Sequence, residues 1–181
     1  MNIPNILTTI RFILIGVFVF VFFDKEIEHN TIWAFVVFVI AGITDALDGF
    51  LARRYNQITK WGKLMDPLAD KLMIITVLTC LYIAGTIPMW VIIVMALKEL
   101  LMIIGAALLY KDGVVVQANI YGKVATVLFY LAITLIVFDL SYSMHVLTIA
   151  VISTILALIQ YTIKGFNAKK VDNSKNLDII K

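Results

Sequence analysis

The sequence has few of the residues that build disulfide-linked or soluble proteins. Its single cysteine, Cys80, lies inside an apolar stretch, so no disulfide framework forms within the chain and nothing indicates a cysteine metal site. Only 15% of the 181 residues are charged, whereas 62% are hydrophobic and the mean hydropathy is +0.99. A soluble domain of this size cannot bury so much apolar surface. The composition therefore indicates an integral membrane protein, and we expect no nucleic-acid partner.

The start of the chain also lacks the features of a cleaved signal peptide. Residues 1–5 contain no lysine or arginine, and no small-residue cleavage site follows Phe23. We therefore expect the first apolar run to be retained as a helix. A helix needs about 20 residues to cross the hydrocarbon core of a membrane. The apolar runs near that length lie at 6–23, 31–53, 64–84, 88–110, 122–140 and 144–164, which predicts an all-α membrane protein with six transmembrane helices.

Lysine and arginine gather in alternate connections between the apolar runs. The connection between the second and third runs carries Arg53, Arg54, Lys60 and Lys63, and five lysines follow position 163. This asymmetry predicts the orientation in a cell membrane, with this connection and both termini in the cytoplasm. We expect residues 1–165 to form one six-helix membrane domain and residues 166–181 to form a short basic cytoplasmic tail.

Four aspartates interrupt the second and third apolar runs. Asp45 and Asp48 are spaced i,i+3, and Asp66 and Asp70 are spaced i,i+4, so each pair shares one face of a helix. The short basic connection makes the two helices neighbours, which lets the two acidic faces meet. Four carboxylates in a partly dry place repel one another unless cations lie among them, and oxygen ligands suit magnesium or manganese. The alternative is a set of structural ion pairs, but too few cations lie nearby to pair all four carboxylates.

The depth of the aspartates follows from the predicted topology. Asp45 lies eight residues before Arg53, which corresponds to about 12 Å along a helix. Asp66 and Asp70 are expected in the first turns of the third helix, where Pro67 is tolerated because the first amides need no helical partner. The four side chains are therefore expected to line a cavity that opens to the cytoplasm within the inner leaflet. That position suits chemistry on a lipid headgroup with a water-soluble partner.

Four cationic side chains are expected in the same half of the membrane or at its midplane: Arg11, Lys71, Lys98 and Lys123. Charges at this depth are expensive and usually face a bundle interior or a wet cavity. For Arg11 and Lys123 the alternative is that the side chain extends to the lipid headgroups. For Lys98 the alternative is an ion pair, with Glu99 or with a neighbour, that only locks the helices together. The sequence leaves these alternatives open.

Residues 45–70 resemble the signature of the CDP-alcohol phosphotransferase family, D-x-x-D-G-x-x-A-R-x8-G-x-x-x-D-x-x-x-D. The fixed positions are Asp45, Asp48, Gly49, Ala52, Arg53, Gly62, Asp66 and Asp70. The likeness continues outside this segment. Residues 4–11 are similar to the opening P-N-x-L-T-x-x-R of the bacterial branch, and residues 122–126 are similar to the G-K-x-x-T stretch before the family's fifth helix.

The resemblance implies an activity and a set of roles. Family members transfer a phosphoalcohol group from a CDP-linked donor to an acceptor hydroxyl and release CMP. By resemblance, the four aspartates hold two divalent ions, Mg²⁺ or Mn²⁺, and Asp70 is the general base. Positions matching Gly49, Ala52, Arg53 and Gly62 approach the CDP donor. Six crossings, a cytoplasmic site and frequent homodimers are also features of the family.

The acceptor is the least determined part of the resemblance. An inner-leaflet site favours CDP-diacylglycerol as donor, and the overall likeness favours the phosphatidylglycerophosphate synthases, which use sn-glycerol 3-phosphate. The four cations named above are then available for the acceptor phosphate. In that branch, however, the fourth helix typically reads R-E-x-x-x-x-x-x-R, whereas this chain has Lys98-Glu99 and then Ala106. Residues 41–50 also resemble the family's cardiolipin synthases, which use phosphatidylglycerol; inositol phosphate and serine are further alternatives.

A divalent-cation transporter is the competing class of function, because carboxylates on neighbouring membrane helices also suit cation passage. Transporter sites tend to lie at the midplane within internal repeats and broken helices. This chain has its carboxylates on one predicted side and no convincing repeat. Release of CMP by the purified protein distinguishes the enzyme from a transporter or a purely structural subunit.

Overall fold

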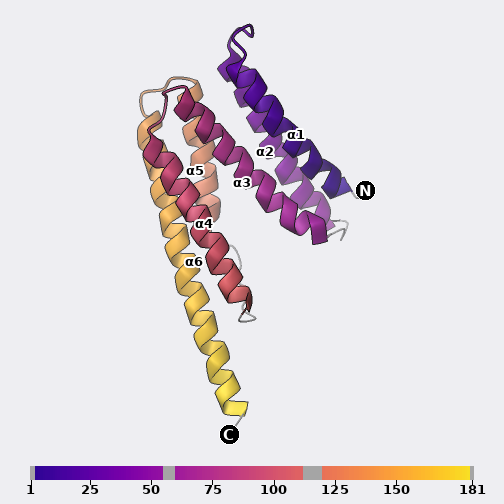
Figure 1. Ribbon diagram of the computed structural model, residues 1–181, viewed down its shortest axis with the longest axis vertical. Helices are drawn as coiled ribbons and strands as arrows, with labels where there is room; N and C mark the ends of the chain where they lie inside the picture. Colours follow the sequence, from indigo (N-terminus) through magenta and orange to yellow (C-terminus); the bar gives the residue numbers. More distant parts are fainter. Residues whose placement is uncertain (1–2, 55–59, 112–119, 180–181) are drawn as a thin grey trace. The chain divides into compact units, whose positions relative to one another are not determined.

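The computed structural model describes residues 3–54, 60–111 and 120–179, and the side chains of residues 7–47, 65, 68–109 and 121–168. Every regular element in these ranges is an α-helix (Figure 1). The helices are α1 (Ile3–Phe23), α2 (Asn30–Arg54), α3 (Lys60–Ile83), α4 (Met89–Lys111), α5 (Ile120–Val137) and α6 (Ser143–Ile179). Each predicted apolar run corresponds to one helix, so the all-helical prediction is confirmed.

Three tight turns connect consecutive helices, and the sequence of each turn explains it. After α3, Gly85 adopts a φ of 74°, the Gly85 amide donates to the Tyr82 carbonyl and the Thr86 amide donates to the Leu81 carbonyl. This pattern satisfies the last carbonyls of the helix and ends it. After α5 the same pattern recurs around Asp139, a residue type that tolerates a positive φ. After α1, the side-chain amide of Asn30 donates to the carbonyls of Phe22 and Asp24.

The chain divides into two compact units, Met1–Met89 and Trp90–Lys181. In the first unit, α1 packs against α2 and α3, and α2 also contacts α3 (Figure 1). Each helix contributes one buried stripe at helical spacing. The buried side chains are Thr8, Arg11, Phe18 and Phe22 on α1, Ala34, Phe38 and Ala41 on α2, and Ala69, Met73, Ile74, Val77, Leu78, Cys80 and Leu81 on α3.

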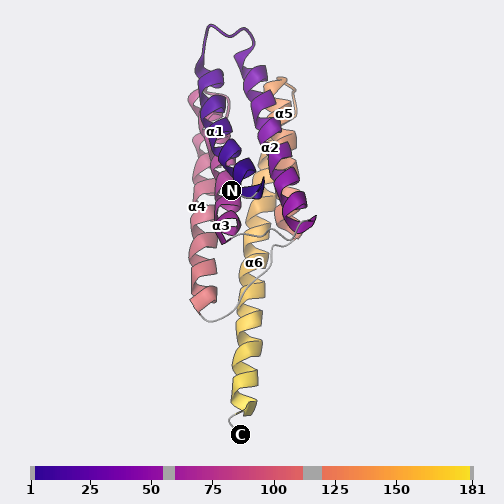
Figure 2. The ribbon, with the colours of Figure 1, turned by 90° about the vertical axis from the view of Figure 1, so that its right-hand side faces the viewer.

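In the second unit, α5 and α6 pack side by side (Figure 2). Their buried residues are Ala125, Phe129, Ala132, Ile133 and Ile136 on α5, and Leu147, Ala150, Val151, Thr154 and Ala157 on α6. Helix α4 reaches α6 through the Thr154 hydroxyl, which lies 3.9 Å from the Met95 sulfur. Helix α6 continues to Ile179, so the residues expected to form a basic tail extend this helix. Their separation from a membrane domain stays a prediction.

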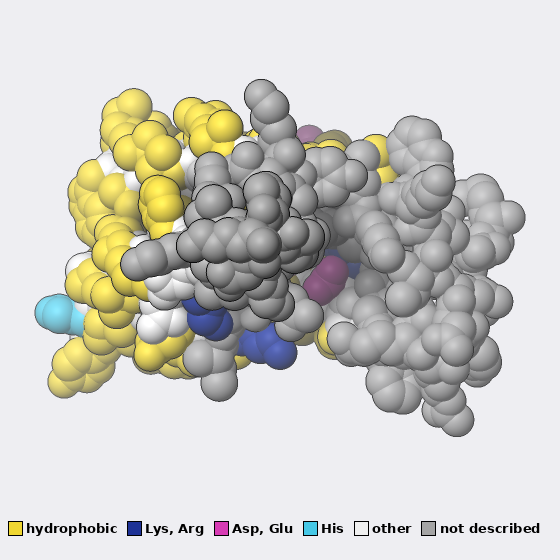
Figure 3. Space-filling view, turned by 90° about the horizontal axis from the view of Figure 1, so that it is seen from below, with side chains coloured by type: hydrophobic (Ala, Val, Ile, Leu, Met, Phe, Trp, Pro, Cys, Tyr) yellow, Lys and Arg dark blue, Asp and Glu magenta, His cyan; other side chains and the backbone are white. Residues whose placement is uncertain are grey.

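The apolar side chains of the described residues lie largely on the outside. Three helices contain stretches long and apolar enough to cross a membrane, namely Asn30–Leu47, Met89–Leu109 and Ser143–Ala168, and shorter apolar stretches occupy Leu7–Phe23 and Tyr121–Val137. Every helix from α1 to α6 carries several exposed large hydrophobic side chains among its described residues. Hydrophobic side chains accordingly dominate the described surface in Figure 3. A surface of this kind is stable in lipid, and the chain is a multi-pass membrane protein.

Candidate active site

Asp45 lies on the buried face of α2. It follows Ala34, Phe38 and Ala41 at spacings of 11, 7 and 4 residues, and these three side chains are almost fully buried. Such spacings keep residues on one side of a helix. The side chain of Asp45 is nevertheless 42% exposed. The carboxylate therefore lies where the interior of the first unit opens to its surroundings.

Arg11 lies on the corresponding face of α1 and meets Asp45. Arg11 belongs to the buried stripe of α1 that also contains Thr8, Phe18 and Phe22, and its side chain is only 1% exposed. Its Nη1 lies 2.9 Å from Oδ1 of Asp45. A guanidinium stays protonated in proteins, so this contact is an ion pair between two helices. It places a permanent positive charge beside the first carboxylate of the motif.

Asp70 lies on the inner side of α3 and is half-buried. It precedes Ile74, Val77 and Leu81 by 4, 7 and 11 residues, and all three are buried. Because α2 contacts α3 and α1 packs against both, Asp45 and Asp70 belong to the inner faces of neighbouring helices. The prediction that the two carboxylate-bearing helices are neighbours is confirmed.

The remaining signature residues have side chains outside the described set: Asp48, Gly49, Ala52, Arg53, Gly62 and Asp66. The backbone places the first four in the last turns of α2 and the other two near the start of α3. Asp48 is one turn beyond Asp45, and Asp66 is one turn before Asp70, so the helical spacing within each predicted pair is present. The roles of these residues stay predictions.

One local prediction for α3 is wrong. Pro67 was expected in the first turn of the helix, but α3 begins at Lys60, seven residues earlier. The missing amide of Pro67 therefore falls inside the helix, where it removes one backbone hydrogen bond. Membrane helices tolerate such positions because neighbouring groups can compensate. The apolar run began at residue 64, and the polar residues before it concealed the true start.

The described carboxylates fit part of a divalent-cation site. Asp45 and Asp70 offer only oxygen atoms, the donors that magnesium and manganese prefer. Nη1 of Arg11 contacts Oδ1 of Asp45, so the first of these carboxylates is also part of an ion pair between α1 and α2. Among the side chains that the structure describes, no three acidic, histidine or cysteine residues converge on one point. The donor chemistry thus suits the predicted ions, and a complete site requires Asp48 and Asp66 as well.

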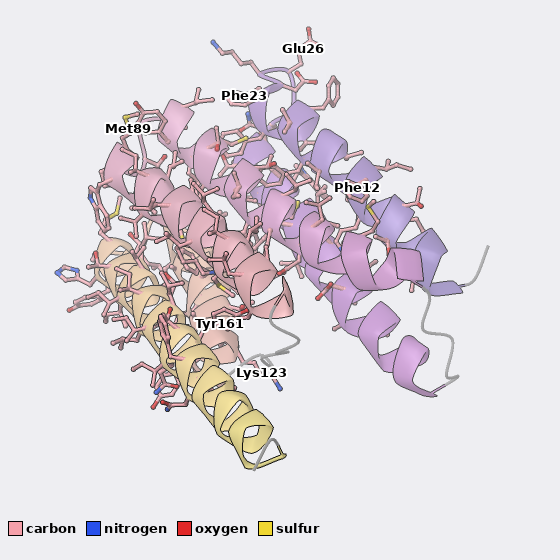
Figure 4. All side chains as sticks on the ribbon, turned by 60° about the horizontal axis from the view of Figure 1, so that its bottom comes forward. Phe12, Phe23, Glu26, Met89, Lys123 and Tyr161 are labelled. Atoms are coloured by element: carbon pink, nitrogen blue, oxygen red, sulfur yellow. The ribbon has the colours of Figure 1, made fainter. Side chains whose placement is uncertain are left out.

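The other predicted cations occupy three different settings. Lys71 follows Asp70 on α3 and is half-buried. Nζ of Lys98 lies 2.6 Å from Oε1 of Glu99 in the middle of α4. The ion pair that was one alternative for Lys98 is therefore present. Lys123 lies in the first turn of α5, where its side chain is exposed and extends away from the helices (Figure 4). Lys98 and Lys123 belong to the second unit, and their meeting with the aspartates at one acceptor stays a prediction.

The sequence predicts a contact of Arg11 with the acceptor and does not reveal the ion pair of Arg11 with Asp45. A usable signal was present in the spacing of Thr8, Arg11, Phe18 and Phe22, which share one face of α1. That face is the interior of the first unit. The partner of Arg11 was not readable, because 34 residues separate it from Asp45 and the rotation of α2 fixes the contact.

Comparison with known proteins adds an independent observation. A family model for CDP-alcohol phosphatidyltransferases matches residues 1–159. The chain is 30% identical over 191 aligned residues to a CDP-diacylglycerol–glycerol-3-phosphate 3-phosphatidyltransferase of Bacillus subtilis, covering 95% of this chain and 99% of the relative. It is 34% identical to a probable phosphatidylglycerophosphate synthase of Mycobacterium tuberculosis, covering 87% and 76%. It is also 35% identical to a CMP-forming cardiolipin synthase of Streptomyces coelicolor, covering 70% and 60%.

Proposed function

Because the chain belongs to the CDP-alcohol phosphatidyltransferase family, we propose that it transfers the phosphatidyl group of CDP-diacylglycerol to sn-glycerol 3-phosphate and releases CMP. The observation that carries this proposal is the family match over residues 1–159, which includes both carboxylate segments. The names of the Bacillus subtilis and Aquifex aeolicus relatives, which align over nearly their whole length, support the same donor and acceptor. The product is phosphatidylglycerophosphate, a precursor of membrane phospholipids.

In the proposed reaction, Asp70 accepts the proton of the acceptor hydroxyl. The acceptor oxygen forms a bond to the phosphorus of the phosphatidyl group, and the bond between that phosphorus and the bridging oxygen of CMP breaks. The electron pair of the broken bond leaves with CMP. A half-buried carboxylate is suited to proton transfer when it lies within hydrogen-bond reach of the hydroxyl. The side chain of Asp70 is half-buried, as this role requires.

The carboxylates also hold the proposed cofactors. Asp45, Asp48, Asp66 and Asp70 would hold two Mg²⁺ or Mn²⁺ ions, which neutralise the charge that develops on the departing CMP. Gly49 and Ala52 leave room for the nucleotide beside the end of α2, and Gly62 does the same at the start of α3. Arg53 offers a forked, permanent charge to a phosphate. These roles are supported by the signature and by the positions of Asp45 and Asp70 on the inner faces of α2 and α3.

The acceptor phosphate needs cationic partners. Lys71 beside Asp70 and exposed Lys123 are the proposed contacts, together with Lys98. We assign the carboxylate site to a cavity on the cytoplasmic side of the membrane. The alternating distribution of lysine and arginine supports that side, and it places both termini there. A homodimer, frequent in the family, stays a prediction without an assigned interface.

Cardiolipin synthesis is the second candidate function. Ala106 stands where phosphatidylglycerophosphate synthases typically have an arginine, and a cation lost there weakens the binding of a phosphorylated acceptor. The Streptomyces coelicolor relative carries the name of that second activity. In this alternative, phosphatidylglycerol supplies the attacking hydroxyl, while the donor and the release of CMP are the same.

The test is CMP release by the purified full-length protein from CDP-diacylglycerol in mixed micelles with magnesium. Glycerol 3-phosphate and phosphatidylglycerol are compared as acceptors at the same concentration of CDP-diacylglycerol in the micelles. Release that depends on glycerol 3-phosphate supports the first proposal and makes Ala106 a tolerated variation. Release that depends on phosphatidylglycerol supports cardiolipin synthesis and makes Ala106 a determinant of specificity. Absence of CMP with every acceptor contradicts both.

A further inference from the structure

We propose that Arg11 is a positioning residue that holds the carboxylate of Asp45 in the orientation in which it binds a divalent cation. This inference rests on the proposed function, because it assigns Asp45 to a metal site. Its geometric basis is the 2.9 Å contact between Nη1 of Arg11 and Oδ1 of Asp45. Groups that hydrogen-bond to a metal ligand fix its orientation and strengthen metal binding.

Burial makes the contact obligatory for Arg11. Its side chain is 1% exposed and is the largest of the fully buried side chains among the described residues. A buried charge is costly unless an opposite charge compensates it. Asp45 supplies that charge from the neighbouring helix. The ion pair therefore ties α1 to α2 at the level where the motif begins.

The two partners differ in exposure, and this difference divides their roles. Asp45 is 42% exposed on its side chain, whereas Arg11 is 1% exposed. A cation arriving from outside the first unit can therefore reach the carboxylate of Asp45. A phosphorylated acceptor cannot reach a guanidinium buried to this extent. Arg11 therefore acts on the reaction through Asp45 and makes no contact with the acceptor.

The substitution that isolates this role is Arg11→Lys. Lysine keeps the positive charge but lacks the planar fork that holds a carboxylate in one orientation. The measurement is the melting temperature of the full-length protein in detergent, titrated with Mg²⁺ and with Mn²⁺ in the absence of substrates. We expect the concentration that gives half of the metal-induced stabilisation to rise about 10-fold or more, as for other groups that orient metal ligands.

Phe18→Leu is the matched control. Phe18 is buried on the same face of α1, where its ring stacks on Phe22 with centroids 5.7 Å apart. Its replacement lowers the melting temperature through packing and keeps the wild-type metal titration. Because this assay contains no substrate, its outcome is independent of CMP release by the wild-type protein, which tests the proposed function separately.

A second readout separates positioning from acceptor binding. With Arg11→Lys at saturating metal, the KM for the acceptor is expected to match the wild-type value. A wild-type metal titration overturns the proposal, and so does an effect confined to the KM of the acceptor.

A further pair of variants tests the contact if Arg11→Lys does not fold. Arg11→Met removes the buried guanidinium that contacts Asp45 and lowers the melting temperature. Adding Asp45→Asn removes the charge of the second partner, and replacing both partners of a buried ion pair is often tolerated. We expect the double variant to regain most of the melting temperature lost in Arg11→Met. Failure to regain any of it contradicts the proposed pairing.

Discussion

Lys98 and Glu99, which are consecutive residues of α4, form an ion pair with Nζ 2.6 Å from Oε1. The pair lies inside Met89–Leu109, a stretch apolar enough to cross a membrane. Consecutive side chains diverge by about 100° around a helix, so both must bend along the helix surface to meet. Their side chains are only 15% and 12% exposed. Mutual neutralisation lowers the cost of placing both charges at this depth.

Removal of either partner is therefore expected to destabilise the protein more than removal of both. Lys98→Met or Glu99→Gln alone leaves one charge of the pair inside the span, at a cost of about 2.5–3.5 kcal/mol. The double variant Lys98→Met/Glu99→Gln should recover most of the lost melting temperature in detergent. A double variant as unstable as the two single losses combined contradicts the pairing.

The same double variant decides between the two roles of Lys98. If Lys98 also binds the acceptor phosphate, the double variant folds but shows a raised KM for glycerol 3-phosphate. We expect a rise of about 10-fold or more, because a hydrogen bond to a charged group contributes about 1.5–3 kcal/mol. A wild-type KM in a folded double variant would restrict the pair to mutual neutralisation of the two charges within α4.

The four aspartates are expected to act as one unit. Asparagine at Asp45, Asp48, Asp66 or Asp70 retains the shape but removes a charged oxygen ligand, so turnover should fall by about 100-fold or more. Asp139→Asn is the matched control, because Asp139 lies in the turn after α5 and asparagine tolerates its positive φ equally well. Near-normal turnover in folded Asp66→Asn would remove that residue from the site.

Arg53 is expected to contribute to donor binding. Arg53→Ala removes a charge-assisted contact to phosphate and should raise the KM for CDP-diacylglycerol about 10- to 100-fold. Arg54→Ala removes the same charge from the adjacent position, which the signature leaves free, and should have a much smaller effect. Equal effects of the two substitutions would indicate a general electrostatic attraction instead of a specific contact.

Two glycines of the second unit provide a matched test of its packing. A Cβ at Gly165 on α6 would lie 2.6 Å from Cδ1 of Leu109 on α4, whereas a Cβ at Gly105 would lie 3.7 Å from Tyr161. Both substitutions to alanine gain the same helix propensity, so their difference reports the collision. Cδ1 is the far end of a flexible side chain, so Leu109 must rotate to make room. We expect Gly165→Ala to be less stable than Gly105→Ala by about 1 kcal/mol or less, the order of the cost of an unfavourable rotamer. A Gly165→Ala variant more stable than Gly105→Ala would contradict the close approach of α4 and α6.

Hydropathy predicted the number and approximate positions of the helices, because a membrane crossing needs a long apolar run. It did not predict where helices continue into polar sequence. Helix α3 begins at Lys60 instead of residue 64, and α6 extends to Ile179. Helices persist there because helix formation depends on backbone hydrogen bonds and propensity, which charged residues also support.

The site was predictable to the extent that its residues are close in sequence. The spacing within the Asp45–Asp48 and Asp66–Asp70 pairs follows from the helical period, and the short connection makes α2 and α3 neighbours. The Arg11–Asp45 contact was not predictable in the same way. It depends on how α1 and α2 rotate toward each other, and composition alone does not specify that rotation.

Phosphatidyl transfer by the carboxylate site is tested by following CMP and labelled lipid together. The reaction uses CDP-diacylglycerol, isotopically labelled glycerol 3-phosphate and magnesium with the wild-type protein and with folded Asp66→Asn. We expect equal molar amounts of CMP and labelled lipid with the wild type, loss of both on chelation of the metal, and almost none with the variant. CMP without labelled lipid, or the same yield of both products from Asp66→Asn, would contradict phosphatidyl transfer by this site.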